Sequence, residues 1–456
     1  MTQIASRKME ETNSVVPILV GTAFGETRSV FLLQLDCVTG LLSYKQSFSL
    51  PHASPGWLLH STVEVKDGVE VGRENASSSK NDSCKILVAY EESPGLVQAF
   101  YTSVDETSSG ASDGAKEGVL DFVPASISIP SEGDAACHLS TDTTGKWIFV
   151  SNYCSGNVGI LSCLNTPENA GLALHSVIRH PPSANYTRQL DPALTDRQEA
   201  PHCHCTAIHP SNRWVAVADL GLSIVSLYPF DSQTGLVVEA EVATQHLELP
   251  IDAGPRHLLW TKDGRYLFIL NELNATLSLA EMAPTNDGST SSTRLRIVQT
   301  IQTDTKKERR HHLGNSDLQL HPNGRFLYVG ARTHTKMEEG IGCILVYEIV
   351  FHEETGAVVG GEGCDSKKET AIVQDLRLLD IVSTQGLVPR NFKILSIPNT
   401  DTTKASSKMK IFLVVGNQES YNVVTFHVDS ESGMLSFAHK LENLPNKPCN
   451  ICPILS

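Results

Sequence analysis

The sequence predicts an all-β protein: a seven-bladed β-propeller of four-stranded antiparallel blades, whose ring is closed by N- and C-terminal strands that share one blade. The first observation is a recurring unit, made of a short apolar run, a turn, and a second β-rich run that ends in a polar residue. Clear copies are HCTAIHPSNRWVAVAD (204–219) and RHLLWTKDGRYLFILN (256–271). In the second copy the turn pair Asp263-Gly264 lies between β-rich runs, which is a hairpin signal. Periodic four-stranded units of this kind are typical of a propeller.

The second observation is the spacing of these units along the chain. We expect the second strands of the blades to end at Thr22, Tyr90, Asn152, Asp219, Asn271, Ala331 and Asn417. The intervals are long for a blade, and the excess falls in polar stretches that indicate surface insertions. We place these insertions near residues 65–83, 165–196, 282–294, 359–370 and 399–408. A large β-sandwich is the competing fold, but it would not need seven similar units.

The third observation concerns the two ends of the chain. The unit that ends at Thr22 lacks a first strand, because only residues 1–15 precede it, and we expect this segment to be disordered. The stretch NKPCNICPIL (446–455) reads as a short strand without a partner of its own. Joining the two completes the seventh blade and removes the open edges of the ring. Residues 16–456 therefore form a single predicted propeller domain.

Composition restricts the class of partner and the location. The chain has 36 basic and 51 acidic residues and a net charge of −15, which argues against nucleic acid or an anionic membrane as the main partner. We find no apolar run long enough to span a membrane and no signal peptide in the first residues. The 11 cysteines have no disulfide-framework spacing, which suits a reducing cytosol. We therefore expect a cytoplasmic monomer.

The hairpin pattern also predicts which residues share a face of the ring. An innermost strand starts at one face, and the second strand returns to that face after the turn. Arg256 and Glu272 are symmetric about Gly264, so we expect them to meet there. The same reasoning gathers one set of polar residues at this mouth of the central channel: His138, Asn152, Tyr153, His202, His204, Asp219, Arg256, His257, Asn271, Glu272, Ser316, Arg332, Arg390, Asn417 and Gln418. Such a concentration of titratable groups indicates a functional site.

Several longer motifs resemble one known family. They include RQEAPHCHCTAIHP (197–210), GPRHLLWTKDGRYLFILNEL (254–273) and GLVPRNF (386–392). With related stretches from about residue 18 to 455, they resemble the lactonase family of seven-bladed propellers. That family includes the propeller-type 6-phosphogluconolactonases and the fungal carboxy-cis,cis-muconate cyclases.

The resemblance implies roles for individual residues. The catalytic candidates that it carries over are His204, Arg256, Glu272 and Arg332. An imidazole such as His204 titrates near neutrality and can serve as a general base. An arginine can hold an oxyanion, a phosphate or a carboxylate, and Glu272 would fix Arg256. The plainer interpretation of the Arg256–Glu272 pair is a salt bridge that pins two strand ends. We expect substrate binding by Asn152, Tyr153, Arg197, His202, His257, Arg390 and Gln418.

The run His202-Cys203-His204-Cys205 raises the question of zinc. Alternate side chains of an extended strand point to opposite sides, so the two histidines would share one side and the two cysteines the other. Only two ligands could then converge, whereas zinc needs three or four. We therefore expect no metal and no cofactor.

Three functions remain open at this point. The first is a metal-independent lactonase that hydrolyses a sugar-acid lactone, and its nearest rival is a cycloisomerase acting on a muconate-type acid. The third is a non-catalytic propeller scaffold, since fold alone does not determine function. A scaffold would not need a base, arginines and a carboxylate in one cluster, so the retained His204, Arg256, Glu272 and Arg332 favour an enzyme. The expected ligand is a small anionic lactone or carboxylate.

Overall fold

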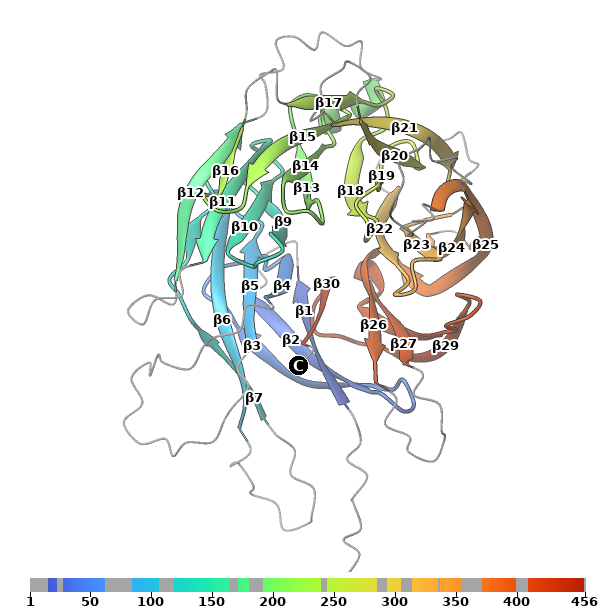
Figure 1. Ribbon diagram of the computed structural model, residues 1–456. Helices are drawn as coiled ribbons and strands as arrows, with labels where there is room; N and C mark the ends of the chain where they lie inside the picture. The colour runs from blue at the N-terminus through green and yellow to red at the C-terminus, as the bar shows by residue number, and fades with distance from the viewer. Residues whose placement is uncertain are drawn as a thin grey trace, which may run out of the picture.

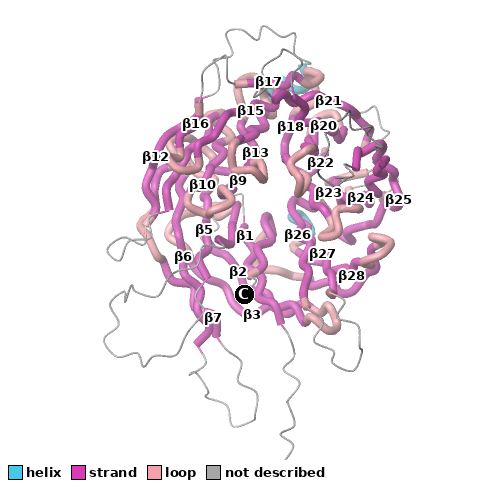
Figure 2. Tube along the Cα trace, viewed as in Figure 1, coloured by secondary structure: helices cyan, strands magenta, loops and turns pink. Residues whose placement is uncertain are grey.

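Seven antiparallel sheets are arranged in a ring, and the regular structure is nearly all strand (Figures 1 and 2). The computed structural model describes residues 15–22, 28–61, 84–105, 119–163, 171–179, 192–238, 244–284, 293–304, 314–334, 337–338, 340–353, 371–398 and 409–454. The predicted fold class, a seven-bladed propeller, is confirmed.

The seven blades share one order of strands from the axis outward. The innermost strands are β4 (Trp57–Ser61), β9 (Ala136–Thr141), β13 (Cys203–Ile208), β18 (Pro255–Trp260), β22 (Asn315–Leu320), β26 (Pro389–Ile397) and β30 (Pro448–Pro453). The second strands are β1 (Val15–Thr22), β5 (Cys84–Tyr90), β10 (Trp147–Asn152), β14 (Trp214–Asp219), β19 (Tyr266–Asn271), β23 (Phe326–Ala331) and β27 (Lys410–Asn417). Each second strand ends at the predicted residue.

The outer half of each blade contains the remaining strands. The third strands are β2 (Ser29–Asp36), β6 (Leu96–Asp105), β11 (Asn157–Cys163), β15 (Ile224–Asp231), β20 (Thr276–Pro284), β24 (Ile341–Glu353) and β28 (Asn422–Val428). The outermost strands are β3 (Leu42–Ser49), β7 (Val119–Pro124), β12 (Leu172–Arg179), β17 (Gln245–Glu248), β21 (Thr293–Gln302), β25 (Ala371–Leu387) and β29 (Leu435–Leu441). Two short strands, β8 (Ile129–Pro130) and β16 (Leu236–Val237), add to β6 and β15.

Helical structure is confined to short turns in the described residues. These are η2 (Pro192–Leu194), α1 (Thr195–Gln198) and η3 (Gln418–Ser420). None of the described helices has the length and apolar character needed to cross a membrane.

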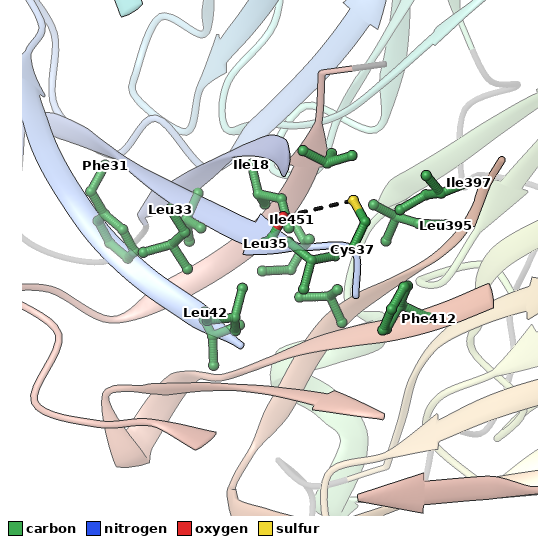
Figure 3. Packing of buried hydrophobic residues seen from close by; sticks show 14 of the residues in the cluster. Ile18, Phe31, Leu33, Leu35, Cys37, Leu42, Leu395, Ile397, Phe412 and Ile451 are labelled. Atoms are coloured by element: carbon green, nitrogen blue, oxygen red, sulfur yellow. Dashed lines mark hydrogen bonds between the residues drawn. The ribbon is translucent and has the colours of Figure 1, made fainter. Parts of the chain in front are cut away.

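The ring closes through β1 and β30, as predicted. The two strands pair antiparallel, with Ile18 opposite Pro453 and Val20 opposite Ile451. Ile18, Val20 and Ile451 are completely buried in a cluster that also contains residues of the neighbouring blade, such as Phe412 (Figure 3). The last strand of the chain therefore forms both a ladder of backbone hydrogen bonds and part of the core between two blades.

Two of the predicted insertions contain regular structure, and three lie outside the described residues. Strand β12 lies within the span 165–196, where it pairs antiparallel with β11 as the outermost strand of its blade. The segments 65–83, 359–370 and 399–408 lie outside the described residues. In the span 282–294, β20 continues to Pro284 and β21 begins at Thr293.

Deletion of β30 tests the closure. A chain that ends at Asn443 exposes the apolar edge of β1, a template for aggregation, and loses the packing of Ile451. We expect it to be insoluble or to melt far below the full-length protein, because the loss rivals the stability of a typical domain, about 5–15 kcal/mol. The control lacks residues 1–14, which precede β1, and should melt like the full-length chain. An equally stable truncated chain in a thermal melt would contradict this closure.

Candidate active site

Two sets of positions at one face of the ring carry the candidate site. In the first set, each residue directly follows a second strand. Its backbone N–H donates to the carbonyl of a residue that precedes the innermost strand of the same blade. The repeated hydrogen bond brings these residues to one level of the ring. The set consists of Glu91, Tyr153, Leu220, Glu272, Arg332 and Gln418.

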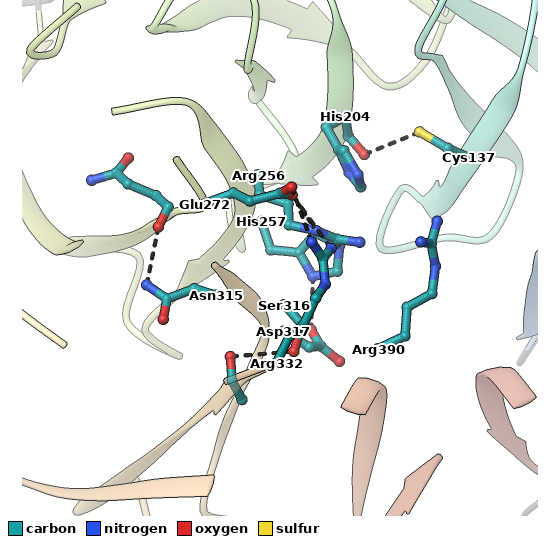
Figure 4. Close-up of polar contacts among 12 residues, drawn as sticks. Cys137, His204, Arg256, His257, Glu272, Asn315, Ser316, Asp317, Arg332 and Arg390 are labelled. Atoms are coloured by element: carbon teal, nitrogen blue, oxygen red, sulfur yellow. Dashed lines mark hydrogen bonds and ion pairs between the residues drawn. The ribbon is translucent and has the colours of Figure 1, made fainter. Parts of the chain in front are cut away.

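The second set lies at β-bulges near the start of the innermost strands. Six of the seven pairings between described innermost and second strands shift register there. A bulge inserts one unpaired residue and redirects its side chain, which is why bulges are frequent beside active sites. The inserted residues are Cys137, His204, Arg256, Arg390 and Cys449, and in the sixth pairing Ser316 and Asp317 together lie opposite Gly330. Figure 4 shows His204, Arg256 and Arg390 gathered around the centre of the ring.

The bulges correct one step of the sequence analysis. The symmetry about the turn predicts that Arg256 and Glu272 face each other across the hairpin. Instead Pro255 pairs with Asn271, and Arg256 is the additional residue of the bulge. The two side chains meet as predicted, but through a bulge and not through a regular ladder pair.

Glu272 lies at the centre of an arginine cluster, formed with Arg197, Arg256 and Arg332. Its Oε1 accepts hydrogen bonds from Arg197 Nη2 at 2.8 Å and Arg332 Nη1 at 3.0 Å. Its Oε2 lies 2.9 Å from Arg256 Nε. Burial alone would raise the pKa of Glu272, but the charges of Arg332, Arg197 and Arg256 hold it well below its usual value. The carboxylate therefore stays ionised and holds three guanidinium groups together.

Arg256 is also held from the side opposite Glu272. Its Nη1 lies 2.6 Å from His257 Nε2, and His257 Nδ1 lies 2.7 Å from Asp317 Oδ1. Asp317 Oδ2 accepts a hydrogen bond from Asn391 Nδ2 at 2.6 Å. Arginine can only donate, so His257 accepts at Nε2 and carries its proton on Nδ1. The guanidinium of Arg256 is therefore held between the Glu272 carboxylate and the His257 ring.

Burial determines the charge state of His257. Burial and the neighbouring Arg256 lower the pKa of His257 to about 4. The ring is therefore neutral near pH 7, as its place between a donor and a carboxylate requires. His257 is predicted to bind substrate, and in the structure its two ring nitrogens contact Arg256 and Asp317.

His204 lies at the bulge of β13, beside the arginine cluster. The centre of its ring is 5.5 Å from that of His257 and 5.8 Å from that of Tyr153. Burial, reinforced by Arg256 and His257, holds the pKa of His204 well below its usual value. Its Nδ1 has no hydrogen-bond partner among the described residues. A neutral imidazole with such a nitrogen can accept a proton from water or from a substrate.

Aromatic rings pack beside these groups. The ring of Trp57 lies 4.4 Å from that of His138 and 5.7 Å from that of His257, measured between centroids. Trp57 Nε1 and His138 Nδ1 are buried and lack hydrogen-bond partners in the described structure. Buried polar atoms without partners are rare in proteins, and here they add hydrogen-bonding capacity beside the axis.

A second ion pair belongs to the same face. Arg390 Nη2 lies 3.5 Å from Glu91 Oε1. Gly56 makes room for this carboxyl group, because a Cβ atom there would lie 2.7 Å from Glu91 Oε1. Burial raises the pKa of Glu91, although Arg390 and Arg256 oppose the shift. The two glutamates at this face therefore have pKa values shifted in opposite directions, as in many acid–base sites.

Glu91 is, with Trp57 and Asp317, a residue of this face that was not predicted from the sequence. It directly follows the second strand of its blade, as Glu272 and Arg332 do in theirs. The strand was correctly predicted to end at Tyr90. The position of Glu91, directly after that end, was the signal that could have identified it as a site residue.

Three of the predicted binding residues lie together beside the arginine cluster. The rings of Tyr153 and His202 are stacked, with centroids 4.4 Å apart. Arg197, on α1, donates from Nε to the Tyr153 hydroxyl at 3.0 Å. The ring nitrogens of His202 contact the Tyr153 carbonyl at 2.9 Å and Glu199 Oε1 at 3.1 Å. Gln418 is buried on η3 and donates to the side chain of the next residue.

Asn152 is the predicted binding residue that lies apart from this cluster. Its Nδ2 donates to Asn157 Oδ1 at 2.8 Å, and its Oδ1 accepts a hydrogen bond from Ser131 Oγ at 2.6 Å. Asn271 and Asn417 hold the corresponding turns of their own blades in the same way. The asparagines that end these second strands therefore stabilise turns.

The four residues of the His-Cys-His-Cys run do not converge. His202 precedes β13 and stacks on Tyr153, while His204 lies at the bulge, so the two histidines do not share one side of a regular strand. Cys203 and Cys205 are buried in two different hydrophobic clusters. Within the described residues, no three His, Cys, Asp or Glu side chains are grouped as metal ligands would be.

Comparison with known families decides the membership of the chain. The family model for lactonases with a seven-bladed β-propeller matches residues 114–450, which is most of the sequence. The protein belongs to this family. The resemblance noted in the sequence is thereby confirmed, although the match itself does not assign roles to individual residues.

Individual relatives agree with this membership. The chain is 26% identical over 318 residues to the 6-phosphogluconolactonase of Bacillus subtilis (strain 168), covering 70% of this chain and 73% of that one. A periplasmic gluconolactonase from Pseudomonas aeruginosa superposes with a TM-score of 0.64 at 20% identity, over 97% of this chain and 99% of that chain. A protein from Lactobacillus plantarum gives 0.63 at 19% identity, over 97% and 100%. At such identities the structural likeness establishes the fold.

The free energies of unfolding of variants in the arginine cluster test whether its side chains act together. We expect Arg256→Ala and Glu272→Ala to be non-additive, with a coupling of about 0.5–3 kcal/mol, because the two side chains form one buried pair. Urea denaturation of the two single variants and the double variant measures this coupling. The matched control is the more exposed Arg265–Glu281 pair of the same blade, for which we expect less than about 1 kcal/mol. Additive losses at Arg256 and Glu272 would mean that the groups act separately.

Proposed function

We propose that this protein is a metal-independent lactonase that hydrolyses a sugar-acid lactone carrying an anionic group. The observation that carries the proposal is the meeting of Glu272, three arginines and the neutral His204 at one face of a lactonase-family propeller. Lactone hydrolysis needs a base for water and a donor for the oxyanion, and these residues supply both. The 6-phosphogluconolactonase activity of the Bacillus subtilis relative makes 6-phosphogluconolactone the first substrate to test.

Electrostatics favours an anionic substrate. Four arginines, Arg197, Arg256, Arg332 and Arg390, lie with two glutamates at this face, although the chain as a whole carries a net charge of −15. A local excess of guanidinium groups attracts phosphate or carboxylate and binds it through paired N–H donors. The rest of the acidic surface would repel the same anion.

Each group has a defined task in the proposed reaction. His204 accepts a proton from the attacking water at its unpartnered ring nitrogen. The guanidinium of Arg256 donates to the carbonyl oxygen as negative charge develops there. Glu91, whose raised pKa favours the protonated form, donates a proton to the ring oxygen that leaves as an alcohol. Arg332 and Arg390 hold the anionic group of the substrate.

A panel of substrates tests the proposal. Acid release in a pH-stat should be fastest with 6-phosphogluconolactone, slower with unphosphorylated gluconolactone, and unchanged after dialysis against EDTA. Loss of activity on chelation, restored by zinc, would contradict a metal-independent reaction. Conversion of carboxy-cis,cis-muconate without lactone hydrolysis would identify a cycloisomerase, and no turnover of any compound would identify a binding scaffold. The monomeric state and the cytoplasmic location stay predictions.

Replacement of His204 tests the base. We expect His204→Ala to lower turnover by about 10²–10⁴-fold while the protein stays folded, which is the usual contribution of a positioned acid–base group. The matched control is His209→Ala, at the other end of the same strand, where His209 Nε2 contacts the Gly264 carbonyl. Steady-state rates, with circular dichroism to verify folding, provide the comparison. Wild-type turnover in His204→Ala would remove this residue from the mechanism.

The pH profile of kcat/KM tests both shifted groups. Because the pKa of His204 is lowered, its base form persists below the usual histidine range, so the acid limb should lie below pH 6.5. The protonated form of Glu91 is lost as pH rises through its raised pKa, so Glu91→Gln should remove an alkaline limb that wild type retains. Glu92→Gln is the matched control, since Glu92 contacts the Ala53 backbone N–H instead. An identical profile in Glu91→Gln would contradict the proposed acid.

A further inference from the structure

Lys85 and Cys163 form an unusual pair between two blades, away from the candidate active site. Lys85 is the second residue of β5, and Cys163 is the last residue of β11 in the neighbouring blade (Figure 1). Lys85 Nζ lies 2.7 Å from Cys163 Sγ. Only 1% of Lys85 is exposed, whereas Cys163 is partly exposed. Glu91 lies beyond the opposite end of β5, so the pair takes no part in the proposed catalysis.

The separation is short for a contact with sulfur. By comparison, thiol hydrogen bonds of Cys37, Cys137 and Cys205 span 3.6–3.8 Å. Even N–H···O bonds are about 2.7–3.2 Å long, and sulfur is a larger acceptor than oxygen. A distance of 2.7 Å is too long for a direct N–S bond. It suits two covalent bonds through one intervening atom.

The surroundings of the Lys85 amine give an independent reason to consider a covalent link to Cys163. A buried ammonium group is costly unless a carboxylate or several hydrogen bonds compensate it. Among the described residues, the thiol of Cys163 is the hydrogen-bond partner of Lys85 Nζ, and no carboxylate pairs with it. A covalent bond at Nζ leaves an uncharged nitrogen and removes this cost. The partly exposed sulfur can meanwhile be reached by a small oxidant.

We propose that Lys85 and Cys163 form a reversible covalent bridge, Nζ–O–Sγ, when the protein is exposed to hydrogen peroxide. One peroxide oxidises the thiol to a sulfenic acid and leaves as water. A second peroxide removes one hydrogen from the sulfenic O–H and one from the amine N–H, so that an N–O bond forms and two waters leave. Four thiol equivalents, such as two molecules of dithiothreitol, return the amine, the thiol and one water.

The bridge would be a redox-controlled covalent cross-link between two neighbouring blades. It joins the second strand of one blade to the third strand of the next, which no backbone ladder connects. A cross-link between distant residues restricts the unfolded chain and therefore stabilises the folded protein, as a disulfide does. Oxidised protein should melt at a higher temperature than reduced protein.

Peptide mass spectrometry of the full-length protein tests the bridge. After peroxide treatment, the peptides that contain Lys85 and Cys163 should be linked, with one oxygen more and two hydrogens fewer than their summed mass. The link should disappear with dithiothreitol and be absent from Lys85→Met and Cys163→Ser. Cys154→Ser is the matched control, because Cys154 is the more exposed thiol and lies in the same blade, and it should keep the link.

Other products would overturn the proposal. A linked pair lighter by two hydrogens with no added oxygen would indicate a direct S–N bond. Higher oxidation of Cys163 with an unmodified Lys85 would show that the amine does not capture the sulfur. The oxidised wild-type protein should also melt higher than its reduced form, a difference that Cys163→Ser should lack. Because wild type carries the decisive mass measurement, the test holds even if a variant folds poorly.

Discussion

The salt bridges of Glu272 to Arg197, Arg256 and Arg332 are the interaction on which the candidate site depends. The three arginines come from different parts of the ring: α1, the bulge of β18 and the end of β23. Without a shared carboxylate, guanidinium groups so close together would repel one another in a poorly solvated place. One buried glutamate therefore allows several blades to contribute positive charge to a single binding region.

The propeller supplies the positions at which this chemistry is placed. Two places reach the same face in most of the blades: the residue after the second strand and the bulge at the start of the innermost strand. Neither belongs to the regular ladder, so its side chain can vary while the blade stays intact. The family fold can thus carry an ion pair such as Arg390–Glu91 without a change in architecture.

The sequence was sufficient to predict the regular pairing of the strands, but not the bulges that interrupt this pairing. Apolar alternation and turn residues predicted the end of every second strand and the closure by β30, because both follow from local pairing rules. The bulge that displaces Arg256 adds one residue to the innermost strand, and neither the apolar pattern nor the turn residues marks that addition. Asn152 illustrates a related limit, since a polar residue at a strand end can equally hold a turn. The proximity of Lys85 and Cys163 could not be predicted from the sequence, because the two residues belong to different blades and meet only in the packed ring.

The affinity for 6-phosphogluconate, the open acid of the proposed substrate, is the most direct test of the role given to Glu272. Isothermal titration calorimetry would compare wild type with Glu272→Gln, which removes one negative charge and nearly preserves shape. If Glu272 positions the arginines, we expect weaker binding despite the more positive site. Tighter binding to Glu272→Gln would show that the carboxylate only opposes the anion, and would contradict its role as organiser of the site.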